Sequence, residues 1–166
     1  MRSIVLIAHN LRSCYNVGSL LRTAEGLGVS KVYLTGYTPY PLEAADTRLP
    51  HLAQKIDKQI HKTALGAEKQ IEWHYTDDIL MLFTKLKDND FTIAALEQTA
   101  DSLALPQYKV PEKIAIVLGR EVEGIETEVL SACDVALEIP MFGSKESFNV
   151  AQAAAMALYH CRFIGM

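Results

Sequence analysis

The sequence predicts an α/β domain in which helices cover both faces of a parallel β-sheet. Short apolar runs alternate along the chain with longer stretches of helical periodicity. Such alternation is typical of parallel sheets whose strands are connected by helices. The chain has 166 residues and no internal repeat, which fits the length of one domain. We therefore expect residues 1–166 to form a single domain.

In the first half of the chain, residues 3–8 are an apolar run with Ile and Val, which favours a buried strand. A polar turn and a helix over residues 17–27 follow, and residues 31–35 are the next expected strand. Residues 52–65 have a mixed helical pattern. Residues 71–75 alternate weakly between apolar and polar side chains, which indicates a strand.

In the second half, further strands are expected at residues 91–96, 113–119 and 135–139, and helices at residues 77–86, 127–133 and 147–163. Ligands of parallel sheets bind at the carboxyl ends of the strands. This rule brings the segments after the last three strands together as a candidate binding site: residues 96–97, 119–121 and 140–149.

The first expected helix places an arginine opposite its apolar stripe. Asn16 is a suitable N-cap and Gly28 a suitable C-cap for the apolar positions Val17, Leu20, Leu21, Ala24 and Leu27. At 100° per residue, Arg22 points about 160° away from the centre of that stripe, and Gly18 and Gly26 flank it. Each helical glycine costs about 1 kcal/mol relative to alanine. We therefore expect a backbone or a substrate to approach this face, although the periodicity fits a solvated arginine equally well.

The segment after the last expected strand contains a loop rich in Pro, Gly and Ser and then an Ala-rich helix starting near Ser147. Ser147 and Asn149 are both N-cap residue types, which accept hydrogen bonds from the free N–H groups of a first helical turn. The same N–H groups also attract polar and anionic ligands. Helix capping is the commoner role, so this segment indicates a ligand site only in combination with others.

Composition argues against several classes of protein. The three cysteines are odd in number and widely spaced, which favours a reducing cytoplasm over a disulfide framework. No apolar run reaches the ~18 residues that span a bilayer, and the histidines show no metal-ligand spacing with cysteine, so we expect neither a membrane nor a metal. The net charge of −4 argues against binding nucleic acid over the whole surface, but residues 1–36 carry four basic residues and one acidic residue.

Motifs of common enzyme classes are absent from the sequence. There is no G-x-G-x-x-G after the first strand, no G-x-x-x-x-G-K-[ST], no G-x-S-x-G and no H-E-x-x-H. A dinucleotide fingerprint, a P-loop, a serine-hydrolase elbow and a zinc-protease motif are therefore not candidates.

Three other segments together resemble the motifs of the SpoU (TrmH-type) RNA 2′-O-ribose methyltransferases of the SPOUT superfamily. They are Asn16-Val-Gly-Ser-Leu-Leu-Arg22-Thr-Ala, Ile116-Val-Leu-Gly119-Arg-Glu121-Val-Glu-Gly124-Ile, and Ile139-Pro-Met141 with Ser147-Phe-Asn149-Val-Ala. The segments follow the family's order and approximate spacing, and the resemblance extends over nearly the whole chain. Phe148 stands where the family more usually has Leu.

The resemblance implies a SPOUT α/β domain with a deep trefoil knot at its C-terminal end, S-adenosylmethionine bound within the knot, and an obligate homodimer. It implies 2′-O-methylation of tRNA or rRNA in the cytoplasm. We expect no appended RNA-binding domain, so that RNA recognition comes from this domain, its dimer and the basic N-terminal third.

The same resemblance assigns roles to particular residues. The catalytic set would be Arg22, Asn16, Glu121, Ser147 and Asn149, and the cofactor contacts, largely from backbone, would be Leu96, Gly119, Ile139, Met141, Ser147 and Phe148. Arg22 would act on the ribose 2′-hydroxyl. Because a free arginine has a pKa above ~12, it could serve as a base only with assistance from RNA phosphate. An orienting or electrostatic role is equally compatible with the sequence.

Two other readings fit parts of the sequence. The chain could be a non-catalytic RNA-binding or ribosome-assembly factor that retains the SPOUT fold, in which case S-adenosylmethionine binding without turnover, or no binding, is expected. A flavodoxin-like domain for another small ligand is compatible with the strand pattern but leaves the three motifs unexplained.

Overall fold

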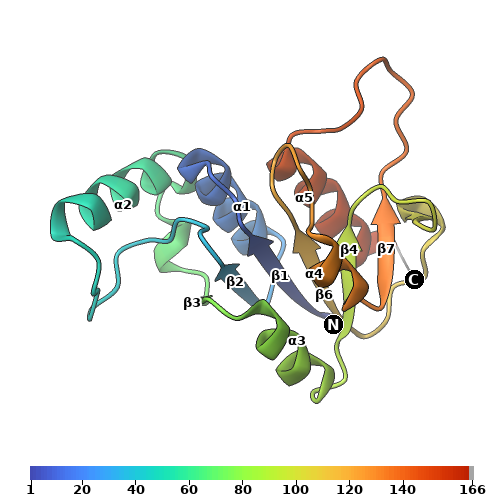
Figure 1. Ribbon diagram of the computed structural model, residues 1–166, viewed down its shortest axis with the longest axis horizontal. Helices are drawn as coiled ribbons and strands as arrows, with labels where there is room; N and C mark the ends of the chain where they lie inside the picture. The colour runs from blue at the N-terminus through green and yellow to red at the C-terminus, as the bar shows by residue number, and fades with distance from the viewer. Residues whose placement is uncertain (165–166) are drawn as a thin grey trace.

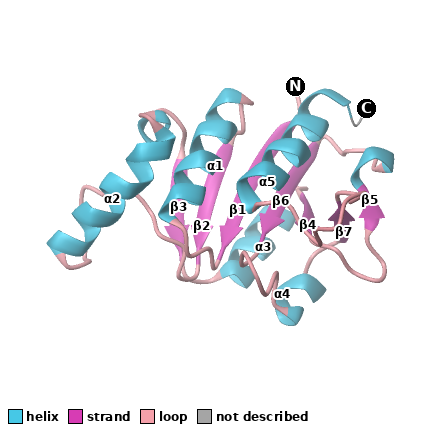
Figure 2. Ribbon diagram, turned by 90° about the horizontal axis from the view of Figure 1, so that it is seen from above, coloured by secondary structure: helices cyan, strands magenta, loops and turns pink. Residues whose placement is uncertain are grey.

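The computed structural model of the chain describes residues 1–164 and contains a seven-stranded sheet with helices on both faces (Figures 1 and 2). Its strands are β1 Ser3–His9, β2 Lys31–Thr35, β3 Trp73–Thr76, β4 Thr92–Leu96, β5 Leu103–Ala104, β6 Lys113–Leu118 and β7 Val135–Glu138. They are ordered β3-β2-β1-β6-β4-β7-β5, and every neighbouring pair is parallel. The predicted fold class is confirmed, whereas the trefoil knot stays a prediction.

In the described part of the chain, five α-helices connect or follow the strands: α1 Cys14–Gly26, α2 Pro50–Ala64, α3 Ile79–Lys87, α4 Thr127–Ser131 and α5 Val150–Tyr159. The last helix continues as a π-helical segment, His160–Ile164, and short 3-10 segments occur at Ala67–Lys69 and Leu105–Gln107. Among residues 1–164, no helix combines the length and the hydrophobicity needed to cross a bilayer.

The alternation of side chains along β1 divides the core into two layers. Ile4, Leu6 and Ala8 face the layer formed with α1, α2 and α5, whereas Val5 and Ile7 face the layer formed with α3 and α4. Figure 2 shows α1 and α5 on one side of the sheet and α3 and α4 on the other. Both faces of the central strands are buried, as expected for parallel strands connected by helices.

The start of α1 differs from the expected one. Ser13, and not Asn16, is the N-cap, and its hydroxyl accepts the backbone N–H of Asn16 at 3.2 Å. The predicted cap at Asn16 is therefore wrong, because the helix begins at Cys14 and Asn16 lies within its first turn. The side-chain amide of Asn16 is consequently available for contacts outside the helix.

The start of α5 also lies later than expected. The helix begins at Val150, and Asn149 caps it by accepting the N–H of Ala151 at 2.9 Å. Ser147 is exposed and precedes the cap, so the expected helix start at residue 147 is wrong. The loop between β7 and α5 extends away from the sheet (Figure 1), and Ser147 belongs to this loop.

Gly18 does not lie on an open face beside Arg22. It is buried against α2, where an added Cβ would overlap the Ile60 carbonyl oxygen and the Thr63 hydroxyl and would lie 2.9 Å from the backbone nitrogen of Ala64. The close approach that the sequence predicted at this glycine is therefore made by another backbone, that of α2. Gly26, in contrast, has no atom within 4 Å of such a Cβ.

Candidate active site

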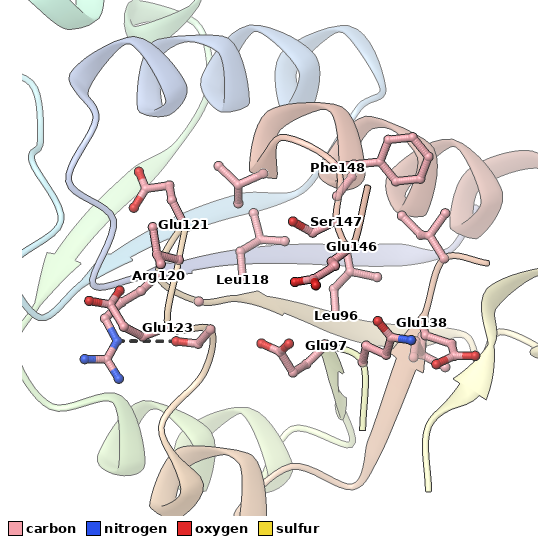
Figure 3. Close-up of a pocket in the computed structure, with 18 of the residues that line it drawn as sticks. Leu96, Glu97, Leu118, Arg120, Glu121, Glu123, Glu138, Glu146, Ser147 and Phe148 are labelled. Atoms are coloured by element: carbon pink, nitrogen blue, oxygen red, sulfur yellow. Dashed lines mark hydrogen bonds between the residues drawn. The ribbon is translucent and has the colours of Figure 1, made fainter. Parts of the chain in front are cut away.

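A cavity of about 280 Å³ lies at the carboxyl ends of β4, β6 and β7 (Figure 3). Its wall is formed by the ends of these strands and the loops that follow them, with the start of α5: residues 96–98, 118–124, 137–139, 141, 146–148, 150 and 153. The three loops that the strand-end rule predicted to come together do meet at this cavity.

All six residues predicted to contact a cofactor line this one cavity: Leu96, Gly119, Ile139, Met141, Ser147 and Phe148. Gly119 is buried at the end of β6, and an added Cβ there would lie 2.6 Å from the backbone nitrogen of Ile125. The chain therefore has no room for a side chain at this position. The role of the six residues in cofactor binding stays a prediction.

Glu121 joins the loop after β6 to the start of α1. Its carboxylate accepts the backbone N–H groups of Arg12 and Ser13, each at 3.2 Å, and the side-chain amide of Asn16 at 3.4 Å. Burial raises the pKa of the Glu121 carboxyl, but the hydrogen bond from its own backbone N–H and those from Ser13, Arg12 and Asn16 together outweigh burial, so that the pKa lies below its ordinary value. Glu121 is therefore ionised at neutral pH and serves as an acceptor.

Asn16 in turn contacts the start of α5. The Asn149 side-chain nitrogen donates to the Asn16 side-chain oxygen at 3.2 Å, while the Asn149 oxygen caps α5. Glu121, Asn16 and Asn149 thus form a chain of hydrogen bonds that connects all three motif segments. The asparagine that caps the last helix also belongs to the candidate site.

Arg22 and Ser147 are placed differently from these three residues. Ser147 lies on the cavity wall, where Figure 3 shows it beside Glu146. Arg22 is exposed and lines a separate hollow with residues that include Leu65 and Gln70. Among residues 1–164, the Arg22 side chain has no hydrogen-bond or ion-pair partner, while its backbone lies within α1. A single chain therefore does not bring Arg22 together with the other four predicted catalytic residues.

A comparison with known families gives a match over most of the chain. The SpoU rRNA Methylase family matches residues 3–159. The chain belongs to this family. Membership covers all three motif segments and the whole cavity described above.

Curated relatives of this SpoU-family chain include two enzymes with RNA substrates in their names. A tRNA (guanosine(18)-2'-O)-methyltransferase of Borreliella burgdorferi is 25% identical over 158 residues, which are 94% of this chain and 64% of the relative. The 23S rRNA (guanosine-2'-O-)-methyltransferase RlmB of Neisseria meningitidis is 27% identical over 96% of this chain and 58% of its own length. The chain thus spans less than two thirds of the length of these relatives.

Solved structures of two RNA-modifying enzymes share the fold. A TrmH/SpoU tRNA modifying enzyme of A. aeolicus superimposes with a TM-score of 0.79 at 20% identity, covering 98% of this chain and 75% of the other. An AdoMet-bound rRNA methyltransferase of Sinorhizobium meliloti superimposes with a TM-score of 0.77 at 19% identity, covering 96% and 56% respectively. At these identities the likeness establishes the common α/β architecture.

The cavity of this SpoU-family chain is strongly acidic, which the sequence analysis did not anticipate. Five glutamates and one arginine are among its lining residues: Glu97, Glu121, Glu123, Glu138, Glu146 and Arg120. Arg12 neutralises Glu123 at 3.0 Å, and Ser102 donates its hydroxyl to Glu138 at 2.7 Å. A wall of this charge favours a cationic ligand and disfavours a phosphate. Among residues 1–164, no cluster of His, Cys, Asp and Glu is suited to a metal ion.

For three of these glutamates, the sequence contained little indication that they would line the cavity. Glu123 and Glu146 lie in loops and are exposed, so their sequence context resembles that of ordinary surface charges. Glu138 ends β7, where its side chain is as compatible with solvent as with a cavity. Glu97 was foreseeable, because it directly follows a predicted strand whose end contributes to the site.

Proposed function

We propose that this SpoU-family chain transfers a methyl group from S-adenosylmethionine to a ribose 2′-hydroxyl of tRNA or rRNA. The observation that carries the proposal is the single cavity at the ends of β4, β6 and β7, joined by Glu121, Asn16 and Asn149 to the start of α1. Family membership supports it, and so do the activities in the names of the relatives above.

The residues of the cavity fit S-adenosylmethionine. Gly119 lines the cavity with its backbone, and the glutamates suit the positive charge of a sulfonium. The backbone at Leu96, Gly119, Ile139 and Met141, with Ser147 and Phe148, would hold the molecule. When bound, S-adenosylmethionine supplies an electrophilic methyl group.

The remaining chemistry falls to side chains at the edge of the cavity. A ribose hydroxyl is a weak nucleophile that must be held in line with the methyl group and must lose one proton, which passes to water. The amides of Asn16 and Asn149, fixed by Glu121 and by the cap of α5, can hold the RNA ribose by hydrogen bonds. Arg22 supplies a guanidinium that can bind RNA phosphate with two parallel hydrogen bonds and orient the hydroxyl.

This role requires Arg22 to lie close to the cavity. Within a single chain, Arg22 does not line the cavity. We therefore propose a homodimer in which a second copy completes the site. Exposed apolar side chains at the end of α5 support this proposal: Tyr159 and Phe163 are each 52% exposed with ring centroids 4.9 Å apart, and Ile164 is 59% exposed. Clustered apolar side chains of this kind are typical of interaction surfaces.

The homodimer is tested by sedimentation equilibrium at micromolar concentration. We expect a mass twice that of the 18.4 kDa chain and a shift toward the monomer in the double variant Tyr159→Glu, Phe163→Glu, because two buried carboxylates would oppose association. Met81→Glu is the matched control, since Met81 is 56% exposed on α3, on the opposite side of the sheet. A wild-type chain that sediments as a monomer would contradict the proposal.

Enzymatic function is tested by incubating the chain with isotopically labelled S-adenosylmethionine and total RNA and identifying the labelled nucleotide by mass spectrometry. We expect a 2′-O-methylated ribose. Calorimetry with S-adenosylmethionine separates the alternatives when no label is transferred. Binding without transfer favours a non-catalytic RNA-binding or assembly factor, and absence of binding contradicts the cofactor assignment as well.

The cytoplasm is the proposed location. Cys14, Cys133 and Cys161 are all free thiols, and burial raises the pKa of the Cys133 thiol to about 12 and that of Cys161 to about 11. Thiols that remain protonated are unreactive, and free cysteines suit a reducing compartment.

A further inference from the structure

Glu97 directly follows β4 and is half-buried in the wall of the cavity. Figure 3 shows its carboxylate below Glu146, directed toward the loop that carries Arg120 and Glu123. None of the three motif segments contains this residue. Its contacts nevertheless run to the second motif, the loop of residues 119–125.

The Glu97 carboxylate holds the far end of this loop. Its Oε2 accepts the backbone N–H of Ile125 at 3.0 Å. Gly124, the preceding residue, has a positive φ of 73°, and a Cβ added there would overlap Glu97 Oε2 and lie 3.0 Å from its Cδ. The carboxylate therefore lies directly against the Gly124 backbone, in a position that only glycine leaves open.

The loop is closed tightly around this contact. Arg120 and Gly124 exchange two backbone hydrogen bonds of 3.1 Å each. A Cβ on Gly119 would lie 2.6 Å from the backbone nitrogen of Ile125 and 2.7 Å from the carbonyl carbon of Gly124. The Ile125 nitrogen that Glu97 holds is thus packed against Gly119, whose backbone is a candidate cofactor contact.

The same loop carries Glu121, which reaches away from Glu97 to the start of α1 and to Asn16. A displacement of the loop would consequently move both Gly119, which lines the proposed cofactor site, and Glu121, which fixes the amides proposed to hold the RNA ribose. Glu97, directly after β4, connects this loop to the end of that strand through the Ile125 N–H.

We propose that Glu97 is a positioning residue, which fixes the loop of residues 119–125 so that the cofactor wall and the network of Glu121, Asn16 and Asn149 keep one geometry. The inference rests on the proposed function, because it assigns S-adenosylmethionine to this cavity. It requires Glu97 to act as a hydrogen-bond acceptor for Ile125 and does not require its charge.

The requirement for an acceptor separates two substitutions. Glu97→Ala removes the acceptor, and we expect the dissociation constant for S-adenosylmethionine to rise about 10-fold to 100-fold, the range that corresponds to losing a hydrogen bond to a charged group. Glu97→Gln keeps a side-chain oxygen for Ile125, and we expect affinity within about 3-fold of wild type. Calorimetry gives the affinities, and hydrogen exchange of the Ile125 amide reports the contact itself, with faster exchange in Glu97→Ala only.

Asp134→Ala is the matched control. Asp134 accepts the backbone N–H of Ile93 at 2.8 Å, so it holds the opposite end of β4 through the same kind of bond, far from the cavity. We expect this variant to lower Tm without changing affinity. Gly124→Ala tests the same contact without changing Glu97. The added methyl group would push the Glu97 carboxylate away from Ile125, so we expect weaker binding of S-adenosylmethionine and faster exchange of the Ile125 amide.

Wild-type affinity for S-adenosylmethionine in both Glu97→Ala and Gly124→Ala would overturn the proposal. Equal weakening of binding in Glu97→Gln and Glu97→Ala would also overturn it, because the charge of Glu97 would then determine the affinity. If the wild-type chain does not bind S-adenosylmethionine at all, the proposed function fails. Exchange of the Ile125 amide still tests the Glu97 contact in that case, since unchanged protection in Glu97→Ala overturns it and faster exchange supports it.

Discussion

Replacing Arg22 by alanine is expected to lower the rate of methyl transfer to RNA by about 100-fold to 10,000-fold, the range that a positioned proton-transfer or charge-stabilising group contributes. The affinity for S-adenosylmethionine should stay at the wild-type value, because Arg22 does not line the cavity. The free energy of unfolding should change by less than about 0.5 kcal/mol, since the side chain is exposed. Initial rates on total RNA, calorimetry and thermal unfolding provide the three measurements.

Two further variants make the Arg22 result specific. Lys55→Ala removes an exposed cation from α2 and should reduce transfer by less than about 3-fold, the effect of one screened surface charge. Arg22→Lys keeps the positive charge but loses the planar fork that binds phosphate with two bonds. We expect intermediate activity if the charge of Arg22 is what matters and activity as low as that of alanine if the fork is required. Undiminished transfer by Arg22→Ala would remove this residue from the catalytic set.

The position of the cavity could be predicted from the sequence because it follows from parallel topology. Apolar runs are strong signals when both faces of a strand are buried, as in β6, where every residue from Ile114 to Leu118 is buried. Once the strands are known, the loops after β4, β6 and β7 must share one edge of the sheet. The meeting of these loops at one cavity follows from the topology, whereas the choice of the six cofactor residues on its wall came from the resemblance to the SpoU family.

Helix starts were less predictable, because several residues of the right type compete. Ser13 and Asn16 lie three positions apart in the sequence, and both can cap a helix. The structure selects Ser13 because Glu121, from a loop more than a hundred residues away, accepts the N–H groups of Arg12 and Ser13 and the Asn16 amide. Local propensity contains no information about that carboxylate. The two-residue strand β5 escaped prediction because it is too short to show a pattern.

Arg22 illustrates a second limit of sequence patterns. Helical periodicity correctly placed it on the solvent side of α1, but periodicity describes faces and not the neighbours of a face. Gly18 is only four residues away on a nearby face, yet it is buried against α2, whereas Arg22 stays exposed beside the C-terminal end of that helix. Which of two neighbouring positions on the surface of α1 becomes buried depends on the angle between α1 and α2. The local sequence does not determine that angle.

Gly18→Ala is expected to destabilise the chain by about 2 kcal/mol. The added methyl group would overlap the Ile60 carbonyl oxygen and the Thr63 hydroxyl. The hydroxyl can rotate, but it donates to the Tyr15 carbonyl at 2.8 Å, and the Ile60 carbonyl belongs to the α2 backbone, so the two helices must separate. Overpacking costs about 1–3 kcal/mol, and overlap with a backbone atom belongs at the upper end of that range. The gain of about 1 kcal/mol in helix propensity offsets part of this cost and leaves about 2 kcal/mol. Thermal unfolding should show a Tm lower by about 4–8 °C.

Gly26→Ala is the matched control for Gly18→Ala, because it makes the same chemical change in the same helix where no atom lies within 4 Å of the new methyl group. Here the change affects only the conformational freedom of the backbone in the unfolded chain, and we expect stabilisation by about 0.5 kcal/mol. Opposite signs at the two positions would demonstrate that Gly18 serves the packing of α1 on α2. Equal stabilisation at both would mean that the helices can separate without cost, and the glycine would then need an explanation outside the folded chain, such as close approach of RNA.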